Sequence, residues 1–110
     1  MDKAFEEKVI AIITEIPKGK VLTYGEIATE AGNKMGARDV SEILHFLSEK
    51  HHLPWQRVIN AQGEIAFSNN HLAQKQRRLL EEEGIVFRDG KIDPKEDGFK
   101  KHQSDLGGFF

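Results

Sequence analysis

The segment from Pro54 to Val58 sets an indole, an amide and a guanidinium side by side. Trp55, the only tryptophan of the chain, has a delocalised nitrogen lone pair and is not a useful nucleophile, although its face can stack on a flat ligand. Gln56 cannot act as a general base. Arg57 is a permanent cation that can anchor a loop through hydrogen bonds or an ion pair. The segment can therefore hold a ligand, but it carries no group for covalent catalysis.

The rest of the chain adds neither a thiol nor a metal-binding motif. There is no cysteine, which excludes disulfides, thiolate metal sites and a thiolate nucleophile. The five histidines lack metal-ligand spacing, and we expect no metal and no cofactor. The formal net charge of −2 is unfavourable for a DNA-binding protein, because cations placed at phosphates supply much of the affinity. Basic residues nevertheless gather at Lys18, Lys20, Lys34, Arg38, Arg57, Lys75, Arg77 and Arg78.

The first half of the chain has helical periodicity. Apolar residues at helical spacing predict a helix over about residues 2–16, which Pro17 ends. Thr23 and Glu26 form a capping-box pattern at the start of a short second helix. A third helix is predicted over about 35–49. Two short helices joined by a tight connection that contains glycine are typical of a helix-turn-helix motif, whose second helix reads DNA.

The period changes to that of strands after Pro54. Residues 57–59 and 64–67 are predicted to form a hairpin around a loop that ends in glycine. A further helix is expected over about 72–83, followed by a short hairpin over 85–92 that turns on Asp-Gly. Helices first, then hairpins and one more helix, indicate an α+β fold of the winged helix-turn-helix type.

One domain accounts for most of the 110 residues. We expect it to span residues 1–93 and to be followed by a loosely held polar tail, 94–110. The chain contains no apolar run near the roughly 18 residues of a membrane span, and its charged N-terminus lacks the apolar stretch of a signal peptide. These features favour a cytoplasmic monomer without a membrane partner.

Several motifs in register resemble the O6-alkylguanine-DNA alkyltransferases. The matching stretches are Ile16 to Ala28, Ala37 to Val40, Pro54 to Ile59, and Gly63 with Leu72. Tyr24, Arg38 and Trp55 are 14 and 17 positions apart, as are the tyrosine, arginine and alkyl-accepting cysteine of that family. Tryptophan in place of that cysteine resembles the alkyltransferase-like branch. The resemblance implies a non-catalytic protein that binds double-stranded DNA containing O6-alkylguanine, flips the damaged base and flags it for nucleotide excision repair proteins.

The resemblance also implies roles for residues near the helix-turn-helix. Arg38, next to Ala37 at the start of the third helix, would be a finger that enters the slot left by the flipped nucleotide from the minor groove. Tyr24 would crowd a phosphate and rotate the backbone, and the amides of Thr23 and Tyr24 would suit a phosphate. The alternatives are an ordinary exposed arginine and a half-buried aromatic that packs on the next helix.

The lesion pocket is expected around the tryptophan. Trp55 would form one wall, with Pro54, Arg57 and Ser68 nearby, and the alternative is a tryptophan that belongs to the core. Gln56 replaces a histidine that, in the enzymes, relays a proton from the thiol to a glutamate. Glu83 resembles that glutamate and would be vestigial here, or a hydrogen-bond partner at a helix end.

The sequence also departs from the family pattern. Asp39 and Glu42 stand on the reading helix where the family has small residues, and their carboxylates would repel phosphates. The segment 67–70 is neutral where the family often has a tyrosine or a basic residue. Two other functions therefore stay open. One is a winged helix for DNA or protein binding that has lost lesion recognition, and the other is an alkyltransferase with a different nucleophile.

Overall fold

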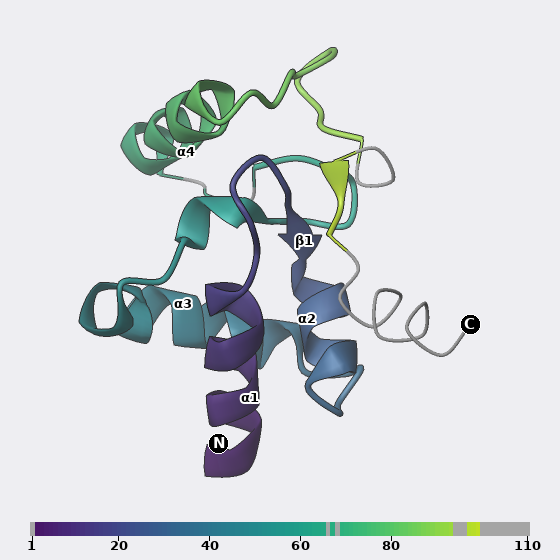
Figure 1. Ribbon diagram of the computed structural model, residues 1–110, viewed down its shortest axis with the longest axis vertical. Helices are drawn as coiled ribbons and strands as arrows, with labels where there is room; N and C mark the ends of the chain where they lie inside the picture. The colour runs from purple at the N-terminus through teal and green to yellow at the C-terminus, as the bar shows by residue number, and fades with distance from the viewer. Residues whose placement is uncertain (1, 66, 68, 94–96, 100–110) are drawn as a thin grey trace.

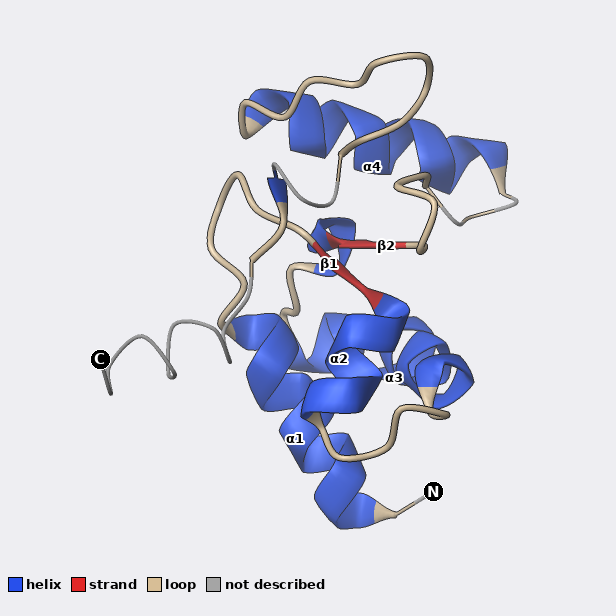
Figure 2. Cartoon of the chain, turned by 90° about the vertical axis from the view of Figure 1, so that its right-hand side faces the viewer, coloured by secondary structure: helices blue, strands red, loops and turns tan. Residues whose placement is uncertain are grey.

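The computed structural model describes residues 2–65, 67, 69–93 and 97–99 (Figure 1). Its elements are α1 (Lys3–Thr14), β1 (Leu22–Thr23), α2 (Tyr24–Glu30), α3 (Ala37–His51), a 3-10 helix η1 (Trp55–Arg57), β2 (Val58–Ile59) and α4 (Asn70–Glu82). The first three helices form a bundle, and α4 lies beyond the two short strands, away from that bundle (Figure 2). The predicted α+β class with a helix-turn-helix is confirmed.

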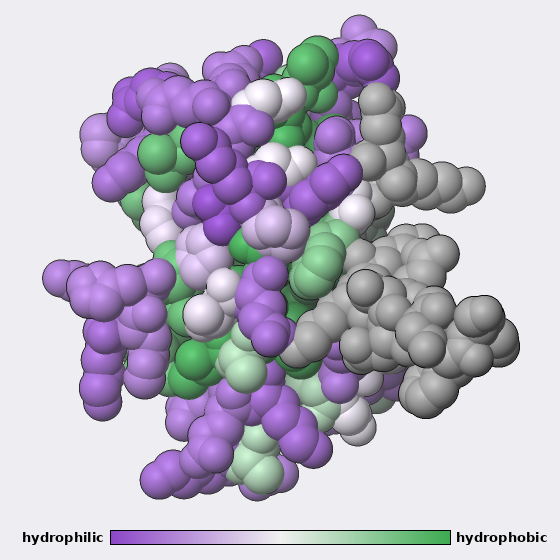
Figure 3. Space-filling model, viewed as in Figure 1, coloured by the Kyte–Doolittle hydropathy of each residue, from purple (hydrophilic) through white to green (hydrophobic). Residues whose placement is uncertain are grey.

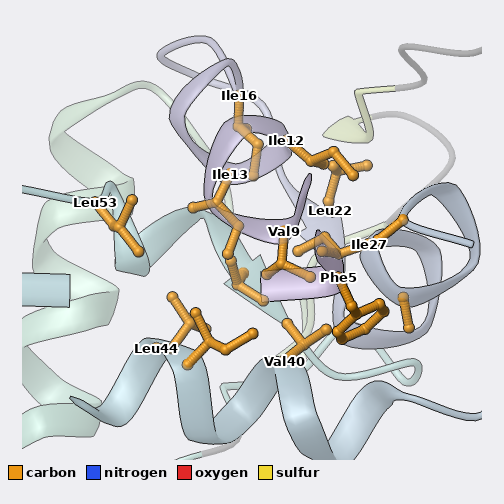
Figure 4. Close-up of a cluster of buried hydrophobic side chains, with 14 residues drawn as sticks. Phe5, Val9, Ile12, Ile13, Ile16, Leu22, Ile27, Val40, Leu44 and Leu53 are labelled. Atoms are coloured by element: carbon orange, nitrogen blue, oxygen red, sulfur yellow. The ribbon is translucent and has the colours of Figure 1, made fainter. Parts of the chain in front are cut away.

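One hydrophobic core joins the three helices of the bundle. Helix α1 buries Phe5, Val9 and Ile13 on one face, the stripe that helical periodicity predicts. Ile27 of α2 and Val40 of α3, both fully buried, pack in the same cluster (Figure 4). The core therefore fixes the orientation of α3 relative to α2.

The connection between α2 and α3 is fixed by backbone contacts. The Asn33 amide donates to the carbonyl oxygen of Ala28 at 2.9 Å, and the Gly36 amide donates to that of Asn33 at 2.9 Å. Gly36 is buried, and a Cβ atom at this position would lie 2.8 Å from Cζ of Phe5. Any larger residue where α3 begins would therefore force the buried ring of Phe5 to shift.

The first predicted hairpin is wrong. Strand β2 pairs with β1 in parallel, with Leu22 opposite Val58, and residues 64, 65 and 67 are not in a strand. The side chain of Asn60 accepts from the backbone amides of Gln62 and Glu64 at 3.1 and 2.8 Å. This local turn competes with a strand ladder, and the Asn60 amide donates to the carbonyl oxygen of Glu64 at 3.1 Å.

The second half of the chain builds a smaller core on the other side of the strands. This cluster consists of Val21, Ile59, Leu80, Ile85 and Ile92. Helix α4 begins at Asn70, two residues before the predicted start, because the Asn69 side chain accepts from the amide of Leu72 at 3.2 Å. The Asp-Gly hairpin is confirmed as a single bridge between Arg88 and Lys91. Both central residues of its turn have positive φ, as a type I′ turn requires.

Part of the predicted tail is paired with the first strand region. The Val21 amide donates to the carbonyl oxygen of Asp97, and the Phe99 amide donates to that of Val21, both at 2.9 Å. Residues 97–99 are therefore held and are not loose, whereas 94–96 and 100–110 lie outside the described residues. Among the residues described, no helix has the length and apolar character needed to cross a membrane.

The capping box of α2 yields a stability prediction. Thr23 Oγ1 accepts from the Glu26 amide at 3.1 Å, and Glu26 Oε1 accepts from the Thr23 amide at 2.9 Å. Replacing Thr23 with Ala should lower the free energy of unfolding by about 1 kcal/mol, because the Glu26 amide loses its partner. Urea unfolding monitored by circular dichroism would measure the change.

Thr29, exposed on the same helix, is the matched control. Thr29→Ala should leave stability unchanged or raise it slightly, since alanine has the higher helix propensity. Equal losses from both substitutions would contradict the capping role.

Candidate nucleic-acid interface

A pocket of about 430 Å³ opens beside α3 and brings together residues from distant parts of the chain. Its described lining is Tyr24, Ser41, Glu42, Leu44, His45, Phe46, Ser48, Trp55, Phe67 and Leu72. Tyr24 begins α2 and Trp55 begins η1, so the pocket lies where the helix-turn-helix meets the second half of the chain. Tyr24, expected at the DNA backbone, and Trp55, expected in the lesion pocket, thus line the same pocket.

Trp55 takes part in both the pocket and the core. It is half-buried and packs against the bundle core while lining the pocket. Its ring meets that of Phe67 edge to face, with centroids 5.6 Å apart and an interplanar angle of 80°. From the sequence, Phe67 was expected to end a strand and to begin a neutral segment, without a role in the site. An aromatic residue in the loop after the Trp55 segment was the available signal.

Tyr24 contributes a neutral hydroxyl to the pocket. The side chain is half-buried at the first position of α2, and burial raises the pKa of its phenol. The Thr23 amide, which was expected to suit a phosphate, donates to Glu26 Oε1 at 2.9 Å. Thr23 is also buried, so its function is to cap the helix that carries Tyr24.

Arg38 lies on the exposed side of α3, at the second residue of the helix and next to the half-buried Ala37. Helical spacing places Ser41, Glu42 and His45, which follow at i+3, i+4 and i+7, on the same side. We call Arg38, Ser41, Glu42 and His45 the pocket flank of α3. The last three line the pocket, and Arg38 lies one turn before them.

Asp39 is not on the pocket flank. This half-buried residue lines a separate hollow together with Asp2 and Lys8 of the α1 region and with Asn33. Asp39 therefore lies toward α1, and which of the two acidic residues faces DNA stays a prediction. Glu42 is the acidic residue of α3 that lines the pocket.

Arg57 points away from the pocket and binds Glu83. Its Nε lies 3.0 Å from Glu83 Oε1 and its Nη2 lies 3.1 Å from Glu83 Oε2, while Nη1 donates to the carbonyl oxygen of Ile16 at 2.8 Å. The Glu83 carboxylate also accepts from Gln56 Nε2 at 2.8 Å and from the Gly19 amide at 3.0 Å. We call Gly19, Gln56, Arg57 and Glu83 the Glu83 cluster.

The described lining of this pocket shares Trp55 with the predicted lesion-pocket set. Arg57 and Pro54 do not line the pocket, because η1 turns Arg57 toward α4 and Pro54 lies at the N-cap of η1. Ser68 lies outside the described residues. The alternatives given for Arg57 and Glu83, a loop anchor and a hydrogen-bond partner at a helix end, are confirmed by the Glu83 cluster.

The Glu83 cluster holds an ionised carboxylate. The Glu83 side chain is 8% exposed, and this burial alone would raise its pKa. Hydrogen bonds from Arg57, Gly19 and Gln56, together with the charge of Arg57, lower the pKa below the ordinary 4.5. The Gln76 amide group, fully buried on α4, adds bonds of 2.9 Å to the carbonyl oxygens of Gln56 and Val58. The backbone that follows Trp55 is therefore fixed from two sides.

Among the described residues, no group of three or more His, Asp or Glu side chains could hold a metal ion. The described lining of the pocket offers aromatic faces, hydroxyls, one carboxylate and one imidazole. Such a site can stack on and hydrogen bond a planar ligand. It has no thiol, since the chain contains no cysteine.

Comparison with known proteins identifies the family. Residues 4–85 match the family described as "6-O-methylguanine DNA methyltransferase, DNA binding domain", and the chain belongs to this family. A DNA base-flipping protein of Vibrio parahaemolyticus is 49% identical over 89 residues, which cover 80% of this chain and 88% of that protein. Alkyltransferase-like protein 1 of Schizosaccharomyces pombe is 44% identical over 82 residues, covering 74% of this chain and 76% of that protein.

A solved structure extends the match to the fold. The crystal structure of S. pombe Atl1 in complex with damaged DNA containing O6-carboxymethylguanine matches with a TM-score of 0.80 and 37% identity. The match covers 91% of this chain and 98% of that chain. The relatives named as a base-flipping protein and as an alkyltransferase-like protein place the chain among the non-catalytic members of its family.

The Glu83 cluster yields a prediction about pH. Because its folded-state pKa is lowered, Glu83 stabilises the fold fully above about pH 4.5, and this contribution is lost as the pH falls through the lowered pKa. Glu83→Gln should cost about 2–3 kcal/mol at neutral pH, since Arg57 then lacks its counterion in a mostly buried site. The stability difference between wild type and variant, measured by urea unfolding, should shrink as the pH falls below about 4.5.

Glu81→Gln is the matched control. Glu81 pairs with Arg77 at 3.3 Å on the surface of the same helix, and the two side chains are about half exposed. This substitution should cost less than about 0.5 kcal/mol at any pH. If Glu83→Gln behaved in the same way, the Glu83 cluster would not constrain the fold.

Proposed function

We propose that this protein recognises DNA damage without repairing it. It would bind double-stranded DNA that contains O6-alkylguanine and hold the flipped base in the pocket beside α3. The observation that carries the proposal is the convergence of Tyr24 and Trp55 on one pocket, one turn beyond Arg38, in a chain without cysteine. The name of the V. parahaemolyticus relative and the damaged DNA bound by the S. pombe relative support it.

Each residue of the proposed site would have its own role in base flipping. Extruding a nucleotide costs a few kcal/mol of stacking and pairing. Arg38 is exposed at the start of α3, where its planar cation can enter the vacated slot and hydrogen bond the orphaned base. Tyr24 would crowd the phosphate beside the extruded nucleotide. Trp55 and Phe67 would hold the base by stacking or edge contacts, which form reversibly because no covalent bond is made.

The steps after binding rest on the resemblance to the alkyltransferase-like branch. We propose that the bound lesion is passed to nucleotide excision repair proteins, and that the chain acts as a cytoplasmic monomer. A protein that binds a lesion but lacks the chemistry to remove it can aid repair only if other proteins act at the marked site.

A second candidate is a winged helix that has kept the fold and lost lesion binding. Two features of α3 favour it: the carboxylate of Glu42 on the pocket flank, and the side chain of Phe46, which is 73% exposed. An exposed aromatic residue beside a carboxylate suits a protein partner better than a phosphate backbone. A titration with damaged DNA distinguishes the two functions.

The proposed function predicts a lesion-specific signal from Trp55. Titration with a duplex containing O6-methylguanine should quench Trp55 fluorescence, because a base held against the indole changes its surroundings, whereas the unmodified duplex should quench it much less. Arg38→Ala should weaken binding of the lesion duplex by about tenfold or more, because the vacated slot is no longer filled.

Arg78→Ala, an exposed arginine on α4 away from the pocket, is the control and should keep the selective response. Equal quenching by both duplexes, or none by either, would favour the second candidate.

The positions of the two acidic residues of α3 give a separate prediction. Glu42→Lys should tighten binding of any duplex and steepen its salt dependence by about one unit of slope, because one more cation can meet a phosphate. Asp39→Lys should change neither, since Asp39 lies on the α1 side. Fluorescence anisotropy over a salt series measures both effects, and a larger effect at Asp39 would mean that DNA lies on the other side of α3.

A further inference from the structure

Among the ten described lining residues of the pocket, Glu42 is the only carboxylate, and none is a lysine or an arginine. The remaining lining consists mostly of aromatic and aliphatic side chains with a few hydroxyls. The described lining therefore presents the negative charge of Glu42 to a ligand, with Arg38 one turn away on α3.

That negative charge is not neutralised within the described part of the chain. Glu42 is exposed and forms no ion pair or hydrogen bond through its side chain with another described residue. The cation one turn away on the same helix is Arg38, and it lies beyond the 4.0 Å limit of an ion pair. In the proposed complex Arg38 occupies the DNA stack, and it is then not available to Glu42.

The apolar walls increase the reach of this charge. The apolar part of the lining consists mainly of Phe46, Trp55, Phe67 and Leu72. A flipped base beside these side chains would displace water that otherwise screens the Glu42 carboxylate. On the basis of the proposed function, we infer that Glu42 makes this pocket select O6 substituents that are neutral over those that carry a negative charge. Glu42 is then a specificity-determining residue for the class of lesion.

Relatives need not share this selectivity. The solved complex of the S. pombe relative contains O6-carboxymethylguanine, whose substituent ends in a carboxylate. In this chain that carboxylate would enter a pocket that Glu42 lines. Two like charges roughly 5–8 Å apart in a partly hydrated site correspond to about a two- to fivefold loss of affinity at moderate ionic strength.

The test compares two lesions that differ only in charge. Duplexes would carry O6-carboxymethylguanine or its neutral amide, O6-carbamoylmethylguanine, with unmodified and O6-methylguanine duplexes beside them. The dissociation constants of wild type, Glu42→Gln and Asp39→Asn are measured by fluorescence anisotropy at about pH 8. The result is expressed as the affinity for the amide duplex divided by the affinity for the carboxylate duplex. The repulsion between Glu42 and the DNA backbone is the same for both duplexes and cancels in this ratio.

Wild type should favour the amide by about two- to fivefold, Glu42→Gln should bring the ratio close to one, and Asp39→Asn should leave it at the wild-type value. An unchanged ratio in Glu42→Gln, or a wild-type preference for the carboxylate, overturns the inference while the proposed function stands. If wild type binds none of the three lesions better than unmodified DNA, the proposed function itself fails.

Discussion

The Arg57–Glu83 ion pair is the constraint on which the geometry of the candidate site depends. The two side chains are mostly buried, and taking two charges out of water is favourable only when their remaining hydrogen bonds are also satisfied. Here the remaining hydrogen bonds come from the carbonyl oxygen of Ile16, just after α1, from the Gly19 amide and from Gln56 of η1. Helix α4 therefore cannot shift without breaking several of these bonds at once. Trp55, two residues before Arg57, is positioned as a consequence.

The same ion pair explains how a site of this family can lack the reactive thiol and the general base and still keep its geometry. The resemblance to the alkyltransferases implies that, in those enzymes, a histidine links the reactive thiol to the glutamate that corresponds to Glu83. In this chain Gln56 occupies that position and donates to Glu83 at 2.8 Å, so the carboxylate keeps a partner there. Because Arg57 and Gly19 bind Glu83 independently of any proton relay, the thiol and the base can both be absent without loosening the pocket.

What the sequence predicted well was local. The helical periodicity, the Thr23–Glu26 capping box and the Asp89–Gly90 turn depend on residues a few positions apart, and all are present. The parallel pairing of β1 with β2 joins segments far apart in the chain, and no local pattern encodes that pairing. Motif spacing singled out Trp55 and Tyr24 as functional residues. Phe67 reaches the same pocket because of the path of a loop, which the sequence does not specify.

The two carboxylates of α3 show why side-chain direction could not be obtained from the sequence. Asp39 and Glu42 each adjoin a buried residue, Val40 or Ile43, so both lie at the edges of the apolar face of the helix. Periodicity locates that face but does not say what packs on either edge. The fold places α1 beside one edge and the pocket beside the other. The unfavourable net charge therefore matters less than its distribution, and at the pocket the balance lies between one arginine and one glutamate.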